Sequence, residues 1–214
     1  MKRTSLLFAA MLIANVAMGQ NEKYFQKMGE SLGKFASCTS VDDFQDLANQ
    51  FDVIARVETK EWLPLYYEAH CYILISFMGQ LEASTRDAYL EKAAVSMELM
   101  EDIAPGEAEV YVMKALYHTS HLVVNPPERA MSTTPLIHAA IGKALAIEPT
   151  NPRAIFLRIS NEMGTAAFFG DDTAPFCEEA GQLLESWDNY ELKSPIHPGW
   201  GKEETEGIVS SCGK

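Results

Sequence analysis

Apolar residues recur at every third or fourth position along most of this chain, and prolines and glycines separate the segments that have this spacing. The spacing places apolar side chains on one face of a helix, and no stretch shows the alternation that strands require. The segment 41–57 is the clearest example, because Ser40 can cap it and Asp42 and Asp43 suit the positive end of its dipole. The pattern predicts an all-α fold, with helices over 21–36, 41–57, 61–79, 84–103, 107–123, 134–147, 152–165, 174–189 and 201–212.

These helices follow a plan that repeats along the chain. The segment GKALAIEPTNPRA, residues 142–154, contains a helix with a small alanine, a proline that stops the helix, and polar residues that cap the next one. The region 97–115 repeats the plan, with Pro105 in the place of Pro149. The two prolines lie about ten residues farther apart than a standard repeat of ~34 residues allows. We therefore expect residues 123–135 to form an elongated loop.

The repeated plan resembles the end of a tetratricopeptide repeat, and small residues align at Ala69, Ala115 and Ser160, where two helices would approach closely. The C-terminal third, with NPRAIFLRISNEM, AFFGDD and SPIHPGWGKEETEGIVSSC, is similar to a group of exported bacterial tetratricopeptide-like proteins of unknown role. This resemblance implies an α–α superhelix of about three irregular hairpin repeats with a C-terminal closing helix. It implies nothing about activity.

The start of the chain has the features of a secretory signal peptide. Basic Lys2 and Arg3 precede an apolar run that is shorter than the ~20 residues needed to span a bilayer, and the small residues Ala17 and Gly19 follow it. We expect residues 1–19 to be removed by cleavage after Gly19, which would place the protein in the periplasm or outside the cell. An uncleaved anchor is the alternative.

The remainder, residues 20–214, has the length of a single domain and contains no second segment apolar enough to cross a membrane. The chain is acidic, with a formal net charge of −13. Nucleic acid and anionic lipid would both be repelled by such a surface. We expect neither nucleic-acid binding nor stable membrane insertion, and the oligomeric state stays open.

Four cysteines, Cys38, Cys71, Cys177 and Cys212, allow three disulfide pairings in an exported protein. The pair Cys177 and Cys212 is favoured, because these residues lie at similar distances on either side of the turn over 194–201. Two antiparallel helices joined there would bring the two cysteines level. Four buried free thiols are the alternative.

No catalytic or phosphate-binding motif is present in the sequence. His118 and His121 lie three residues apart and could share one face of a helix, but two ligands are too few for a metal site. His70 and His138 could complete such a site only if the fold brought them close. The sequence therefore predicts no cofactor, no metal and no enzymatic activity.

The leading hypothesis is an interaction module whose concave face holds an extended segment or a helix of an unidentified protein or peptide partner. The alternative is a small-ligand or glycan-binding protein, or a hydrolase, that uses the aromatic cluster within 62–72 beside Glu61 or Glu68. A third possibility is a structural protein whose groove is closed by the N-terminal helix or by a second copy. For the leading hypothesis, the register predicts these partner-binding residues: Tyr66, Tyr67, His70, Met113, Ser120, Arg158 and Asn161.

Overall fold

The computed structural model describes residues 22–212, and this part of the chain is helical, without strands. The elements are a first helix over 22–35, α2 (Val41–Val57), α3 (Leu63–Phe77), α4 (Ala83–Ile103), α5 (Ala108–Val124), α6 (Pro126–Ile147), α7 (Pro152–Phe169), α8 (Ala174–Trp187) and α9 (Lys202–Ser211). The predicted all-α fold is confirmed. The predicted signal peptide, residues 1–19, lies outside the described residues.

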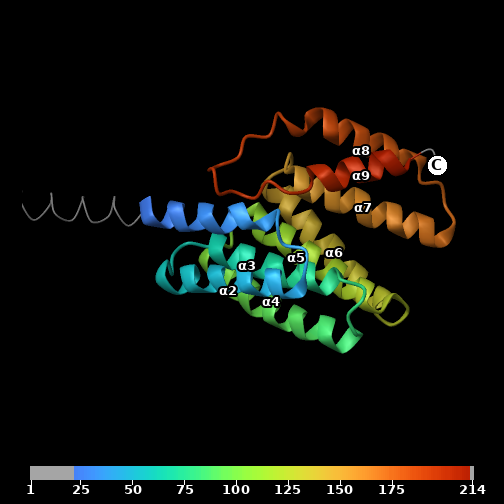
Figure 1. The fold of residues 1–214 in the computed structure, drawn as a ribbon. Coiled ribbons are helices and arrows are strands. Elements are labelled where there is room, and N and C mark those ends of the chain that lie inside the picture. The colour runs from blue at the N-terminus through green and yellow to red at the C-terminus, as the bar shows by residue number, and fades with distance from the viewer. Residues whose placement is uncertain (1–21, 213–214) are drawn as a thin grey trace, which may run out of the picture.

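The helices form an array of antiparallel hairpins (Figure 1). From α2 onward, each helix packs against the next one in the chain, and α3, α5 and α7 also pack against one another in that order. The hairpins α3–α4, α5–α6 and α7–α8 therefore stack through their first helices. Ala69 and Ala115 are fully buried at these contacts, as expected for small residues that let two helices approach closely.

Helix α3 lies at the centre of the fold, because α2, α4 and α5 all pack against it. Most of its side chains are buried, so it lacks the polar face of a surface helix. This central position matters for function. One side of α3 forms the floor of a groove, and another is covered by the C-terminal part of the chain.

The prediction of a loop over 123–135 is wrong, because α6 begins at Pro126. Pro126 and Pro127 occupy the first positions of the helix, where a missing backbone N–H costs no helical hydrogen bond. Pro135 is accommodated inside the helix. The extra residues of this repeat thus lengthen its second helix.

The chain ends in a hairpin of α8 and α9, whose far ends are joined by a disulfide between Cys177 and Cys212. This is the pairing that the sequence favours. Cys38 and Cys71 are free thiols, and Cys71 is buried. Among the helices of the described part of the chain, none has the length and apolar character needed to cross a membrane.

Candidate functional site

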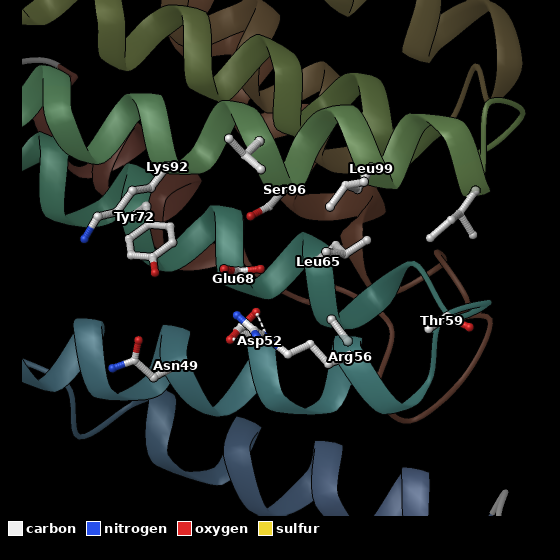
Figure 2. A pocket seen from close by; sticks show the side chains of 13 residues that line it. Asn49, Asp52, Arg56, Thr59, Leu65, Glu68, Tyr72, Lys92, Ser96 and Leu99 are labelled. Carbon is white, nitrogen blue, oxygen red and sulfur yellow. Dashed lines mark hydrogen bonds and ion pairs between the residues drawn. The ribbon is translucent and has the colours of Figure 1, made fainter.

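A groove of about 610 Å³ lies between α2 and α4, and α3 forms its floor (Figure 2). This volume is within the range of ~300–1,000 Å³ that is typical of small-molecule sites. The groove is lined by Asn49, Asp52, Ala55, Arg56, Thr59, Leu65, Glu68, Tyr72, Lys92, Val95, Ser96, Leu99 and Ile103.

The floor is formed by Leu65, Glu68 and Tyr72, which share one face of α3 because they are three and four residues apart. Leu65 and Tyr72 are buried, and Glu68 is half-buried between them. The floor therefore presents one carboxyl group between an aliphatic and an aromatic side chain.

The α4 wall is apolar along much of its length. Val95 and Leu99, one turn apart, are 60% and 50% exposed, and Ile103 continues the same row. Exposed aliphatic side chains that line a concave surface favour an apolar ligand, because the ligand would remove them from water.

The other end of the groove is aromatic and basic. The rings of Tyr72 and Tyr89 stack with centroids 6.1 Å apart, and the Lys92 ammonium lies 5.3 Å and 5.0 Å from their centroids. The Tyr89 hydroxyl also donates a hydrogen bond of 3.0 Å to the Gln45 side chain, which links α4 to α2. This link fixes the spacing of the two walls at that end.

The charged groups of the groove differ in how far they are already paired. Arg56 donates to Asp52 at 2.8 Å along α2, and both side chains stay accessible. Burial raises the pKa of Glu68 to about 7, with a further increase from Asp52; a hydrogen bond from Ser96 and the charge of Arg56 oppose this rise. Glu68 can therefore gain or lose a proton near neutral pH.

Three of the predicted partner-binding residues, Tyr66, Tyr67 and His70, are buried, and the structure corrects their assignment to an open face. The connection between α8 and α9, residues 188–201 (here the closing segment), contacts this side of α3 through Ile196 and Trp200. The Tyr67 hydroxyl donates to the Ile196 carbonyl at 2.9 Å. The chain's own extended segment thus covers the face where a partner segment was predicted.

Met113 and Ser120 are buried as well, since α5 packs between neighbouring hairpins; Ser120 is hydrogen-bonded to Ser76 of α3. Arg158 and Asn161 on α7 remain partly exposed. Arg158 is paired with two glutamates, and Asn161 accepts a hydrogen bond of 3.1 Å from Thr119. The seven predicted positions therefore do not form one open surface.

Beneath the closing segment lies a buried ion pair that sequence reasoning missed. Arg153 donates to Glu109 at 2.7 Å, and both side chains are almost inaccessible. Asn151 and Tyr66 also donate to Glu109, at 2.6 Å and 3.1 Å. Several donors thus satisfy one buried carboxylate, which gives the pair a structural role.

The histidines do not assemble a metal site in the described part of the chain, where no group of three or more potential ligands is close enough to hold an ion. His70 packs between the rings of Phe35 and Trp200, at 5.3 Å and 5.2 Å. His121 is hydrogen-bonded to Thr133.

Sequence reasoning identified part of the groove and missed the rest. Glu68 and Tyr72 belonged to the alternative prediction of a ligand site, and the structure places both on the floor. Trp62, Tyr66 and Tyr67 of the same aromatic cluster lie outside the groove lining. The α4 residues were missed, although Lys92 and Leu99 are seven residues apart and so share a helix face.

By sequence, the chain matches no protein-family model and no curated protein. A comparison with solved structures matches the HusA haemophore from Porphyromonas gingivalis, with a TM-score of 0.77 and 25% sequence identity. The match covers 89% of this chain and 92% of that chain. A helical repeat-like fold is therefore supported, while membership of the tetratricopeptide family stays a prediction. Across nearly its whole length, this chain is similar in fold to a haemophore.

Proposed function

We propose that this protein is an exported ligand-binding protein and that its ligand is haem or a related tetrapyrrole, held in the groove between α2 and α4. The observation that carries the proposal is the groove itself, in a fold similar to that of the HusA haemophore over 89% of the chain. A haemophore is a protein that binds haem. The comparison therefore suggests the class of ligand, and the groove suggests where that ligand would bind.

The chemistry of haem suits the lining of the groove. Haem is a flat apolar ring that carries two carboxylates on one edge. The row of Val95, Leu99 and Ile103 offers an apolar wall for the ring. Lys92 and Arg56 offer cations for the carboxylates, on α4 and α2 respectively. The groove thus combines the two kinds of contact that the ligand needs.

Tyr72 offers its ring to the flat face of the ligand, at the end of the groove where it stacks on Tyr89. Burial raises the pKa of Tyr72 to about 12, with further increases from Glu68 and Asp52. The phenol is therefore neutral at physiological pH.

A binding role is favoured over catalysis by the state of the two carboxylates in the groove. Glycoside hydrolysis would require a pair of carboxyl groups that act on the two sides of one bond. Asp52, the second acid in the lining, is held by Arg56. We therefore propose that the groove takes up its ligand without changing it.

Export is part of the proposal. The predicted signal peptide supports it, as does the disulfide between Cys177 and Cys212, because disulfides persist in oxidising compartments such as the periplasm. A protein or peptide partner stays a second prediction. Of the residues proposed to contact it, Arg158 and Asn161 are the two that remain partly exposed.

The test is a titration of the purified protein with haemin, followed by the absorbance of the bound haem. Wild-type protein should saturate at one haem per chain. Leu99→Glu should weaken binding by at least about tenfold, because a carboxylate would replace an apolar contact beside an anionic ligand.

The matched control is Val57→Glu, which introduces the same charge at an apolar α2 residue that is 67% exposed and outside the groove lining. This variant should bind haem as the wild type does. If Leu99→Glu also binds haem with wild-type affinity, the groove is not the site.

A further inference from the structure

We infer that Glu68 determines the selectivity of the groove for an anionic ligand: as a carboxylic acid it donates a hydrogen bond to a ligand carboxylate, and as a carboxylate it repels that ligand. The inference rests on the proposed function, because it concerns the same groove and the same ligand.

The position of Glu68 is the first support. It lies in the middle of the floor, between Leu65 and Tyr72, and its carboxyl group faces the space between α2 and α4 (Figure 2). A ligand seated on this floor would contact the carboxyl group directly. Glu68 is also half-buried, so less water is present to screen its charge.

The second support is that the cations of the groove contact groups other than Glu68. Arg56 is paired with Asp52 on α2. Lys92 of α4 lies over the rings of Tyr72 and Tyr89. Among the residues that the structure describes, Glu68 therefore has no ion-pair partner, and its charge would be left facing the ligand.

The charged groups around Glu68 show how its protonation changes the net charge of the groove. The groove lining contains the acid Asp52 and the base Arg56 on α2, Tyr72 on α3, and the base Lys92 on α4. Tyr72 is neutral at physiological pH. With Glu68 ionised, acids and bases balance; with Glu68 protonated, one positive charge is in excess. The groove attracts an anion in the second state alone.

The pKa of Glu68, raised by burial to about 7, puts the change between these states near neutral pH. An anionic ligand would raise this pKa further, because a second negative charge disfavours the carboxylate. Binding would then take up one proton, and affinity would increase as the pH falls through about 7. One linked proton allows at most about a tenfold change in affinity per pH unit.

The experiment measures the dissociation constant for haemin between pH 6 and pH 8, for wild-type protein, Glu68→Gln and Glu98→Gln. Glu98 is an exposed acid on α4 outside the groove lining, so its variant is the matched control. The carboxylates of haemin titrate alike in all three experiments. Differences between the three pH profiles of the dissociation constant therefore report the contribution of the mutated side chain.

Wild-type protein and Glu98→Gln should bind haemin about tenfold more tightly at pH 6 than at pH 8, beyond any change seen in Glu68→Gln. Glu68→Gln should bind at pH 8 about as tightly as wild type does at pH 6, because its amide is neutral and can donate a hydrogen bond. If haemin binds but wild type and Glu68→Gln have the same pH profile, the inference is wrong and the proposed function stands. If no protein binds haemin at any pH, both are wrong.

Discussion

The indole N–H of Trp200 donates a hydrogen bond of 2.7 Å to the phenol oxygen of Tyr66, and so joins the closing segment to the centre of α3. The Tyr66 hydroxyl in turn donates to Glu109, which is paired with Arg153. One side of α3 is therefore fixed by a continuous polar network. The groove on another side of the same helix stays accessible.

Removing the Trp200 side chain should destabilise the protein. Trp200→Ala deletes a ring that packs against His70 and Phe156 and leaves Tyr66 without its donor, so we expect a loss of about 3 kcal/mol in the free energy of unfolding. Trp200→Phe keeps most of the packing and should lose about 1–2 kcal/mol. Urea unfolding measures both. Wild-type stability for Trp200→Ala would contradict the proposed role of the closing segment.

The buried ion pair should be far more sensitive to mutation than an accessible one. Glu109→Gln leaves the buried guanidinium of Arg153 uncompensated, and we expect it to cost about 3–5 kcal/mol in chemical denaturation. Lys193→Ala removes an accessible pair with Glu107 and should cost less than about 1 kcal/mol. Equal losses for the two variants would show that Glu109 and Arg153 are solvated in the folded protein.

Buried His70 should make the protein less stable in acid. Burial lowers the pKa of His70 from 6.5 to about 3, so the unfolded chain binds a proton before the folded protein does. Its contribution to stability is complete above about pH 6.5 and is lost as the pH falls from there towards 3. Unfolding free energies at pH 7 and pH 5 should therefore differ less in His70→Phe than in wild type. His138→Phe, at an exposed position, is the control and should retain the wild-type difference.

The disulfide should contribute to stability by restricting the unfolded chain. Cys177 and Cys212 are separated by 35 positions, and closing a loop of that length corresponds to roughly 3–4 kcal/mol in the chain-entropy estimate. Thermal melting of wild type should shift downward in a thiol reductant. Cys177→Ser should melt at the lower temperature with or without reductant, and a further decrease on reduction would contradict the pairing.

Local signals in the sequence were sufficient for most helices. Ser40 and Asp43 show why: the Ser40 hydroxyl accepts from the Asp43 N–H at 3.2 Å, and the Asp43 carboxylate accepts from the Ser40 N–H at 3.0 Å, so the cap lies within four residues. The disulfide could also be predicted, because it depends on the geometry of a single helical hairpin. The start of α6 was missed, because Pro126 and Pro127 were interpreted as loop residues rather than as helix-initiating ones.

The functional surfaces depend on contacts that no local pattern encodes. Tyr67 and Ile196 lie 129 positions apart, so the burial of the predicted partner face could not be read from the register of α3. The groove could not be predicted from local spacing either. Leu99 has the helical spacing of a core residue, and it is exposed because α2 and α4 each pack on α3 and leave a space between them. Which apolar positions stay uncovered is decided by the packing of whole helices.

Haem bound in the groove between α2 and α4 can be located by an NMR titration of isotopically labelled protein with haemin. Ferric iron broadens the signals of nearby nuclei, so the broadened signals locate the ligand. Haem in this groove should abolish the signals around Glu68, Tyr72 and Leu99, while the signals of α8 and α9 are retained. Broadening confined to α7, α8 and the closing segment, with the groove signals unchanged, would contradict binding in the groove.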